Sequence, residues 1–285
     1  MNGQISIIDA LFETQAIRVA PADQPFWYTS GTLGPYYINT HFLYGSEAEA
    51  NQLLVDIEAA VKDPVHLTQQ LSAQIMSQYQ QQPIFQAVIN QLVSSLAGYD
   101  FDFVSGGERR DYFFSIPVAA LLNKPHLTLL KDGQAFLSDV NLQSAHLVVA
   151  GELKGQKAVH LADLVTEASS YTRTWLPALN RCGAIIQETA VVVDRDQGGR
   201  EVLRQAGVEL IALTRIDQHL FEQAKLKGLI DAQQAAQIAL FSQDPHRYLV
   251  EFLAAHPDFL RNQVALGGKA EERARRCVEQ GYGIL

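Results

Sequence analysis

Residues Leu161 to Ser170 read LADLVTEASS and lie between a run of apolar residues and a segment with helical periodicity. The run KAVHLAD predicts a buried strand, and SYTRTWLPALNRCG predicts a helix that ends at Gly183. A strand–turn–helix unit directs backbone N–H groups to the carboxyl edge of a sheet, where the helix N-terminus favours an anion. The stretch therefore predicts a phosphate-binding turn over residues 166–170.

Polar side chains around this turn could contribute to such a site. Thr166, Ser169 and Ser170 carry hydroxyl groups, and Asp163 at the strand end could bind sugar hydroxyls or the water shell of Mg²⁺. The alternative is that Ser169 or Ser170 only caps the helix, a common role for serine. These residues alone leave both interpretations open.

Short apolar runs rich in β-branched residues occur on both sides of the turn. They alternate with helical stretches near 113–122, 169–180 and 199–205. Strands separated by helices are typical of a parallel sheet with right-handed crossovers, so we expect an α/β fold. The runs are FDFVS, HLTLL, AHLVVA, KAVHLAD, ETAVVV and VELIAL.

The rest of the chain completes the predicted architecture. ISIIDALFETQAIR predicts an N-terminal helix, FWYTSGTLGPYYINTHF predicts strand–turn–strand, and the chain after Ile216 has helical patterns throughout. We expect a domain over residues 1–216 with a small N-terminal hood and a helical insertion near 62–96. Residues 217–285 are expected to form a helical extension packed on the core.

Composition restricts the classes of function. The chain has 285 residues, 47% of them hydrophobic, which suffices for one large core. A net charge of -9 argues against a nucleic-acid partner, although local arginines could still hold a small anion. No apolar run approaches the roughly 18 residues of a membrane span, and Cys182 and Cys277 lack metal-ligand spacing. We expect a cytoplasmic protein with no membrane partner.

The stretch 161–170 resembles the signature of the type I phosphoribosyltransferases, a hydrophobic strand followed by acidic residues, apolar residues and a turn rich in Thr and Gly. The wider chain is most similar to the orotate phosphoribosyltransferases. The segments that carry this resemblance are the N-terminal helix, FWYTSGTLGPYYINTHF, GGERRDYFFSIPVA and VVVDRDQGG. The resemblance covers roughly residues 5–216 and implies the parallel sheet of that family, flanked by helices.

The resemblance also implies an activity. In that family, orotate and phosphoribosyl pyrophosphate give orotidine monophosphate and pyrophosphate with the help of Mg²⁺, and the protein forms a homodimer. Lys131 and Asp163 would be catalytic, and Asp163 would contact Mg²⁺ indirectly. The implied ligand contacts are Asp163 to the ribose hydroxyls, Thr166, Ser169 and Ser170 to the 5′-phosphate, Arg109, Arg110 and Lys131 to pyrophosphate, Arg195 to the base carboxylate, and Tyr36 and Tyr37 to the base.

Several residues depart from the family pattern. Ala162 stands where the family has a second acidic residue, and Thr29 stands where it has a lysine. Glu167 and Ala168 replace small residues or glycine in the turn, and only Lys131 and His146 remain of the basic catalytic loop. Loss of one charge-assisted donor can reduce a rate by about 10²–10³. We therefore expect the protein to bind its ligands but to turn over orotate weakly or not at all.

Alternatives remain for the function and for individual residues. A non-catalytic protein of the same fold could sense a nucleotide or bind another protein, and a transferase could use another base. Arg109 and Arg110 could pair with Glu108 and Asp111, and Arg195 could pair with a neighbouring aspartate. The two tyrosines could be packing residues.

Overall fold

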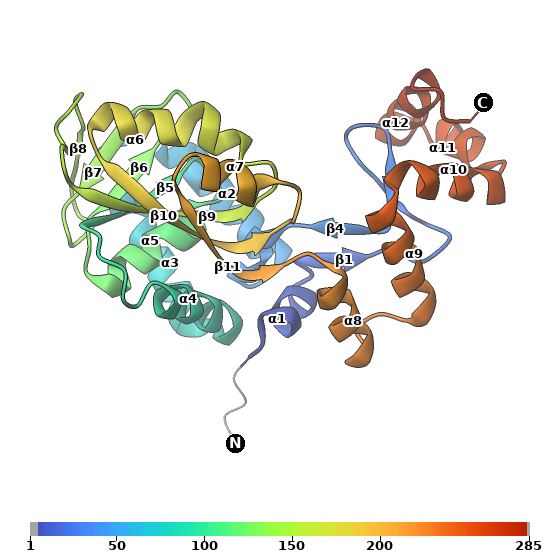
Figure 1. Cartoon of the computed structure of the whole chain (residues 1–285), viewed down its shortest axis with the longest axis horizontal. Helices are drawn as coiled ribbons and strands as arrows, with labels where there is room; N and C mark the ends of the chain where they lie inside the picture. The colour runs from blue at the N-terminus through green and yellow to red at the C-terminus, as the bar shows by residue number, and fades with distance from the viewer. Residues whose placement is uncertain (1–4, 284–285) are drawn as a thin grey trace. The chain divides into compact units, whose positions relative to one another are not determined.

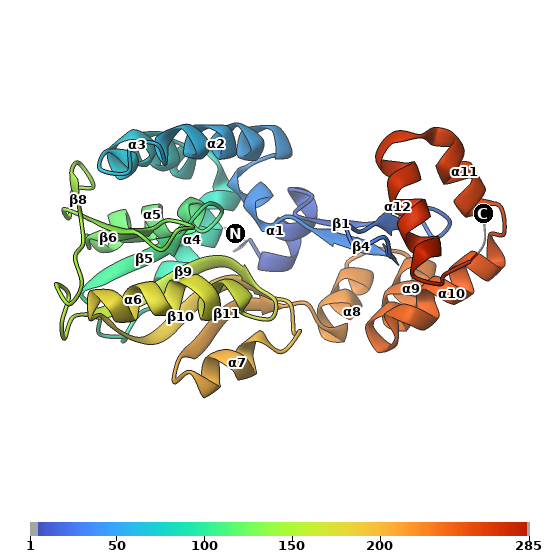
Figure 2. The ribbon, with the colours of Figure 1, turned by 90° about the horizontal axis from the view of Figure 1, so that it is seen from above.

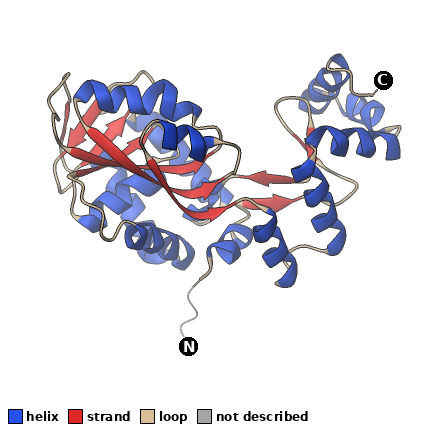
Figure 3. Cartoon of the chain, in the orientation of Figure 1, coloured by secondary structure: helices blue, strands red, loops and turns tan. Residues whose placement is uncertain are grey.

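The computed structural model describes residues 5–283, and its contacts divide the chain into two units. Figure 1 traces the chain by colour, and Figure 3 separates helices from strands. The first unit comprises residues 5–16 and Asn39–Ile216, and the second comprises Ile17–Ile38 and 217–283. Each unit has its own buried residues and is described by itself.

A seven-stranded sheet forms the centre of the first unit. Its strand order is β11-β10-β9-β5-β6-β7-β8, in which the first five strands run parallel and β7 pairs antiparallel with both β6 and β8. This confirms the predicted α/β class. The sequence did not predict β7, which lies in the region compared with a basic loop. The strands are β5 (Phe103–Gly107), β6 (His126–Leu129), β7 (Ala135–Ser138), β8 (Ala145–Leu147), β9 (Lys157–Val165), β10 (Ile185–Asp194) and β11 (Glu209–Arg215).

Helices cover both faces of this sheet. Figure 2 shows α6 and α7 on one face and α4 and α5 on the other, with α2 and α3 outside them. The segment predicted as one helix over 169–180 contains a π-helix, Tyr171–Trp175, before α6 begins. The helices are α1 (Ile7–Glu13), η1 (Thr40–Tyr44), α2 (Glu47–Ala60), α3 (Leu67–Gln81), α4 (Pro83–Ser95), α5 (Tyr112–Leu122), α6 (Leu176–Cys182) and α7 (Gly199–Gln205).

One hydrophobic cluster of the first unit joins the sheet to the turn that follows β9. Val165, Ala168 and Trp175 belong to this cluster together with Leu179 of α6 and Val191 of β10. Burial of apolar area contributes about 25 cal/mol per Å², so packing opposes displacement of the turn. The turn is thus anchored by the core on both of its sides.

The order of the strands identifies one edge of the sheet as a candidate ligand site. From β5 the chain moves to β6 on one side, whereas β9 returns to the other side of β5 and is followed by β10 and β11. Ligands of open α/β sheets bind outside the carboxyl ends of the strands where the order reverses in this way. A ligand site is therefore expected at the segments that follow β5 and β9.

The second unit combines short strands with helices. β1 (Ile17–Val19) pairs antiparallel with β4 (Tyr36–Ile38), and β2 (Phe26–Trp27) pairs antiparallel with β3 (Leu33–Gly34). Its core includes Leu33, Tyr248, Leu249, Phe252 and Leu260. The helices are α8 (Gln218–Leu226), α9 (Ala232–Gln243), α10 (Pro245–Ala255), α11 (Phe259–Leu266) and α12 (Gly268–Glu279).

Side-chain contacts explain why residues 17–38 group with these helices. Trp27 stacks on Phe259 and donates its ring N–H to the Gln263 side chain at 2.8 Å. The division of the chain into domains over residues 1–216 and 217–285 stays a prediction. By contacts, residues 17–38 group with the helices after Ile216. Within residues 5–283, no helix is long and apolar enough to cross a membrane.

Candidate functional site

A cavity of about 490 Å³ lies in the first unit at the carboxyl ends of β5 and β9. It therefore occupies the position that the strand order indicates for a ligand. It contains seven of the ten residues predicted from sequence, namely Arg109, Arg110, Lys131, Asp163, Thr166, Ser169 and Ser170. Their roles stay predictions, but the fold brings them to one place.

The turn after β9 depends on two close backbone contacts. Ala168 adopts a left-handed conformation with φ 55°, although its side chain is buried in the core. Gly199, the last residue of VVVDRDQGG, donates its N–H to the Thr166 carbonyl at 2.9 Å. A Cβ atom on Gly199 would lie 2.5 Å from that oxygen and 3.2 Å from the Ala168 nitrogen. The turn therefore requires glycine at 199.

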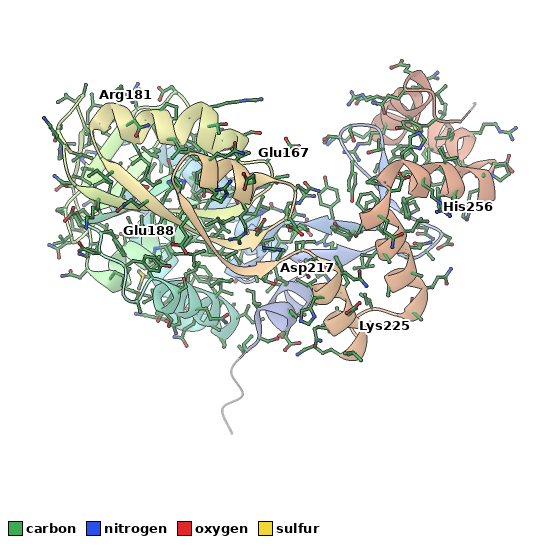
Figure 4. The ribbon with its side chains drawn as sticks, in the orientation of Figure 1. Glu167, Arg181, Glu188, Asp217, Lys225 and His256 are labelled. Atoms are coloured by element: carbon green, nitrogen blue, oxygen red, sulfur yellow. The ribbon has the colours of Figure 1, made fainter. Side chains whose placement is uncertain are left out.

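The hydroxyl groups of the turn are available to a ligand. Ser169 and Ser170 are exposed, and Ser170 precedes the π-helix without a capping hydrogen bond from its side chain. The helix-capping role considered from sequence is therefore not seen at Ser170. Glu167 is exposed and also lines the cavity; Figure 4 labels its side chain on the turn.

Two of the three basic side chains in the cavity are already paired with carboxylates. Arg109 forms an ion pair with Glu58 of α2, and Lys131 forms one with Glu108 at 3.1 Å. Arg110 is exposed, and its side chain makes no ion pair or hydrogen bond with the residues that the structure describes. The pairing of Arg109 and Arg110 with Glu108 and Asp111, considered from sequence, is not observed.

Asp163 presents an unusual carboxyl group to the cavity. Its side chain is 7% exposed, and Oδ1 accepts the Leu164 N–H at 2.8 Å, whereas Oδ2 is buried without a hydrogen-bond partner. Burial, and then the negative charge of Asp111, raise the pKa of Asp163 to about 7, although Arg110 opposes this shift. Asp163 can therefore exchange a proton near neutral pH.

A buried polar network lies beside Asp163, and the sequence did not predict it. His160 of β9 contacts the Ser105 hydroxyl through Nδ1 at 2.9 Å, and its Nε2 lies 3.7 Å from Asp111 Oδ2. Asp111 also lines the cavity. One signal was present in the sequence: His160 and Ser105 interrupt runs that are otherwise apolar, and the sheet order sets those runs side by side.

An aromatic wall completes the cavity. Trp175 and Tyr171 both line it, and Trp175 lies so close to β5 that a Cβ atom on Gly107 would be 2.3 Å from its ring. The rings of Tyr171 and Trp175 lie 5.1 and 6.1 Å from the His160 ring. Trp175 thus belongs both to the hydrophobic core and to the cavity wall.

Similar proteins agree with this geometry. The chain is 26% identical to an orotate phosphoribosyltransferase of Methanoculleus marisnigri over 135 residues, which are 47% of this chain and 75% of that relative. It is 22% identical to the orotate phosphoribosyltransferase of Methanocorpusculum labreanum over 75% of this chain and 97% of that relative. An adenine phosphoribosyltransferase of Mycoplasmopsis agalactiae is 24% identical over 45% of this chain and 81% of its own length. No family model matches the chain.

Solved structures show the same fold. Leishmania donovani UMP synthase aligns with a TM-score of 0.55 and 18% identity, over 82% of this chain and 41% of that protein. The orotate phosphoribosyltransferase of Francisella tularensis aligns with a TM-score of 0.52 and 13% identity, over 83% of this chain and 96% of its own. The chain has the type I phosphoribosyltransferase fold. It is similar in sequence to the orotate phosphoribosyltransferases.

Three residues that the phosphoribosyltransferase resemblance implied at the site do not line the cavity. Arg195 follows β10, and its side chain makes no ion pair with the described residues, so the predicted alternative of a neighbouring aspartate is not observed. The neighbouring Asp194 instead bonds to Arg200 at 3.1 Å. Tyr36 and Tyr37 belong to the second unit, where Tyr36 packs on Phe221 and Phe241 and Tyr37 packs on Phe26 and Tyr28.

The phosphoribosyltransferase resemblance also implied Mg²⁺, and the residues fit only an indirect role for it. Within residues 5–283, no group of three or more His, Cys, Asp or Glu side chains could hold a metal ion. Mg²⁺ commonly keeps several waters and binds through substrate phosphates and one or two carboxylates. The unpartnered Oδ2 of Asp163 fits a hydrogen bond from such a water.

Proposed function

We propose that the first unit binds phosphoribosyl pyrophosphate and transfers its phosphoribosyl group to a pyrimidine base, with orotate as the first base to test. One observation carries the proposal: a single cavity at the reversal of strand order combines the turn hydroxyls, Asp163 and the unpaired Arg110. Similarity to orotate phosphoribosyltransferases supports the choice of reaction. The similarity to an adenine phosphoribosyltransferase makes a purine the second base to test.

The proposed chemistry assigns a task to each part of the cavity. The bond between ribose C1′ and the pyrophosphate oxygen breaks with its electron pair leaving on pyrophosphate, while a base nitrogen bonds to C1′ and loses its proton. Thr166, Ser169 and Ser170 would hold the 5′-phosphate, and Asp163 would bind the ribose hydroxyls. Arg110 would stabilise the charge that develops on pyrophosphate, the most effective form of electrostatic catalysis in a closed site.

The remaining assignments are also proposals. Lys131 would act on pyrophosphate after leaving Glu108, and Arg109 would do so after leaving Glu58. Arg195 would bind the carboxylate of the base. Bound with the ligand, Mg²⁺ would neutralise phosphate charge, with Asp163 accepting a hydrogen bond from its water shell.

Turnover with phosphoribosyl pyrophosphate, Mg²⁺ and a panel of orotate, uracil and adenine tests the proposal through the release of pyrophosphate. Arg110→Ala is expected to lower kcat/KM by about 10²-fold, because it removes a donor that acts on the leaving group. Arg173→Ala is the matched control, since Arg173 is exposed and does not line the cavity. The proposal is wrong if no base is converted and phosphoribosyl pyrophosphate does not bind.

A second candidate is a non-catalytic protein that binds a nucleotide. It is favoured by the ion pairs of Arg109 and Lys131, which leave fewer cations for pyrophosphate, and by Ala162 at the position of a family acid. Groups that act on the transition state raise turnover, whereas groups that hold the ground state raise affinity. Tight binding of orotidine monophosphate with no conversion of any base would favour this candidate.

The homodimer implied by the resemblance is likewise proposed, since two-fold dimers are the commonest assembly of soluble proteins. Light scattering at micromolar concentration is expected to give twice the monomer mass. A monomer mass across a tenfold range of concentration would contradict it.

A further inference from the structure

Asp111 has an unusual position at the start of α5. It occupies the residue before the helix and is 8% exposed, yet its side chain makes no capping hydrogen bond to α5. Instead Oδ2 accepts the Gly107 N–H at 3.0 Å, and Oδ1 accepts the Asp163 N–H at 3.2 Å. Both oxygens are thus bound to backbone amides, one near the end of β5 and one near the end of β9.

These two amides are in the part of the fold where a ligand anion is expected. Gly107 is the last residue of β5, and Asp163 lines the cavity. Backbone N–H groups converging at such an edge normally bind the oxygens of a ligand anion. Here a side-chain carboxylate of the protein takes that place.

The surroundings of Asp111 keep its carboxylate in position. His160 Nε2 lies 3.7 Å from Oδ2 and is itself buried without a hydrogen-bond partner. The two hydrogen bonds from backbone amides also hold the carboxylate in place. A second anion placed beside it would meet this charge, because two like charges in a poorly solvated cavity repel strongly.

The other negative groups of the cavity act in the same direction. Glu108 and Glu167 line it along with Asp111, against Arg109, Arg110 and Lys131. A ligand with one phosphate can use the turn 166–170, to which Asp111 makes no hydrogen bond. A further pyrophosphate group held by Arg109 and Arg110 as proposed would lie close to Asp111, which follows them in the chain and lines the same cavity.

We propose that Asp111 is an internal anion that occupies two backbone donors of the cavity and lowers its affinity for a pyrophosphate group relative to a ribose phosphomonoester. This inference rests on the proposed function in one respect, since it takes the cavity to be a phosphoribosyl site. Asp111 would then be a residue that determines specificity. Its position would also explain why the chain retains the turn 166–170 although its pyrophosphate site is weakened.

Binding of inorganic pyrophosphate and ribose 5-phosphate, each at the same Mg²⁺ concentration, tests the proposal by calorimetry on the full chain. Asp111→Ala and Asp111→Asn are both expected to raise the affinity for pyrophosphate about tenfold, as for the gain of one charge-assisted contact. The affinity for ribose 5-phosphate should change less than threefold. Glu167→Gln is the matched control, because it removes one exposed carboxylate of the same cavity that binds no backbone amide.

A second readout covers the case in which a variant is less stable. The two amides lose their acceptor in Asp111→Ala, so the Tm of this variant should fall. Addition of pyrophosphate should then raise the Tm of the variant by more than it raises the Tm of the wild type. Unchanged pyrophosphate affinity in both Asp111 variants would overturn the proposal. So would an equal gain in Glu167→Gln, since net charge would then explain the effect.

The two proposals fail in different ways. If ribose 5-phosphate binds to none of the proteins, the phosphoribosyl function is wrong, and the comparison with pyrophosphate still decides the role of Asp111. If ribose 5-phosphate binds to all of them and pyrophosphate affinity does not respond to Asp111, only the role of Asp111 is wrong.

Discussion

Replacement of Asp163 by Asn should stabilise the protein at high pH. The folded state raises the pKa of Asp163 from an ordinary value of 3.8 to about 7, first through burial and then through Asp111. Arg110 opposes the shift, and His160 and Tyr171 are the other titratable groups of the surrounding network. Between pH 4 and pH 7 the folded state therefore binds more protons than the unfolded state, and the free energy of unfolding falls as pH rises.

The size of the effect follows from the two pKa values. A difference of about three pH units corresponds to on the order of 4 kcal/mol, present below pH 4 and lost by about pH 8. Asn keeps the oxygen that accepts the Leu164 N–H but cannot ionise. The gain in unfolding free energy of Asp163→Asn over the wild type should therefore rise with pH, by about 2–3 kcal/mol between pH 5 and pH 8, where it reaches its maximum.

Urea unfolding at pH 5, 6, 7 and 8 measures this difference, followed by a probe in the first unit such as Trp175 fluorescence. Glu167→Gln serves as the control, because Glu167 is an exposed carboxylate of the same cavity. Its difference from the wild type should not vary with pH over this range. A pH-independent difference for Asp163→Asn would refute the argument that burial and Asp111 hold this carboxyl protonated.

Three further substitutions test the packing. Gly199→Ala places a Cβ atom 2.5 Å from the Thr166 oxygen, so we expect a loss of about 1–3 kcal/mol and weaker binding of ribose 5-phosphate, measured by thermal unfolding and calorimetry. Ala168→Gly relieves a left-handed residue at φ 55° but removes a buried methyl group, so the change in thermal stability should stay within about 1 kcal/mol; a larger loss would show that the methyl packing dominates. Tyr248→Phe removes a buried hydroxyl that has no hydrogen-bond partner, so stability should be unchanged or rise by about 1 kcal/mol; a clear loss would reveal a hidden partner.

Local pattern was sufficient for most elements of the first unit. Strands such as β9 and β10 contain short, mostly apolar runs, and the helices between the strands have apolar periodicity, so both are visible without any tertiary contact. β7 was missed because a four-residue strand, AFLS, has too few residues for its alternation to differ from that of a loop. The π-helix at Tyr171–Trp175 was missed because its periodicity differs from that of an α-helix over a single turn.

The turn over residues 166–170 was predicted from sequence for a related reason. Its strand, turn residues and helix are adjacent in the chain, and the glycine at 199 was part of the motif that carried the resemblance. The charge partners in the cavity could not be predicted in this way. Arg109 pairs with Glu58, 51 positions away, and Lys131 pairs with Glu108, 23 positions away.

The sequence by itself determined the α/β class, the turn over 166–170 and the departures from the phosphoribosyltransferase pattern, because each depends on residues close together in the chain. The tertiary structure decided which cations remain unpaired, and it placed Asp111 on the amides of two different strands. It also placed residues 17–38 with the helices after 216. Ion pairs, buried carboxylates and unit membership depend on which distant segments the sheet order brings side by side, and that order is not encoded in any short stretch of sequence.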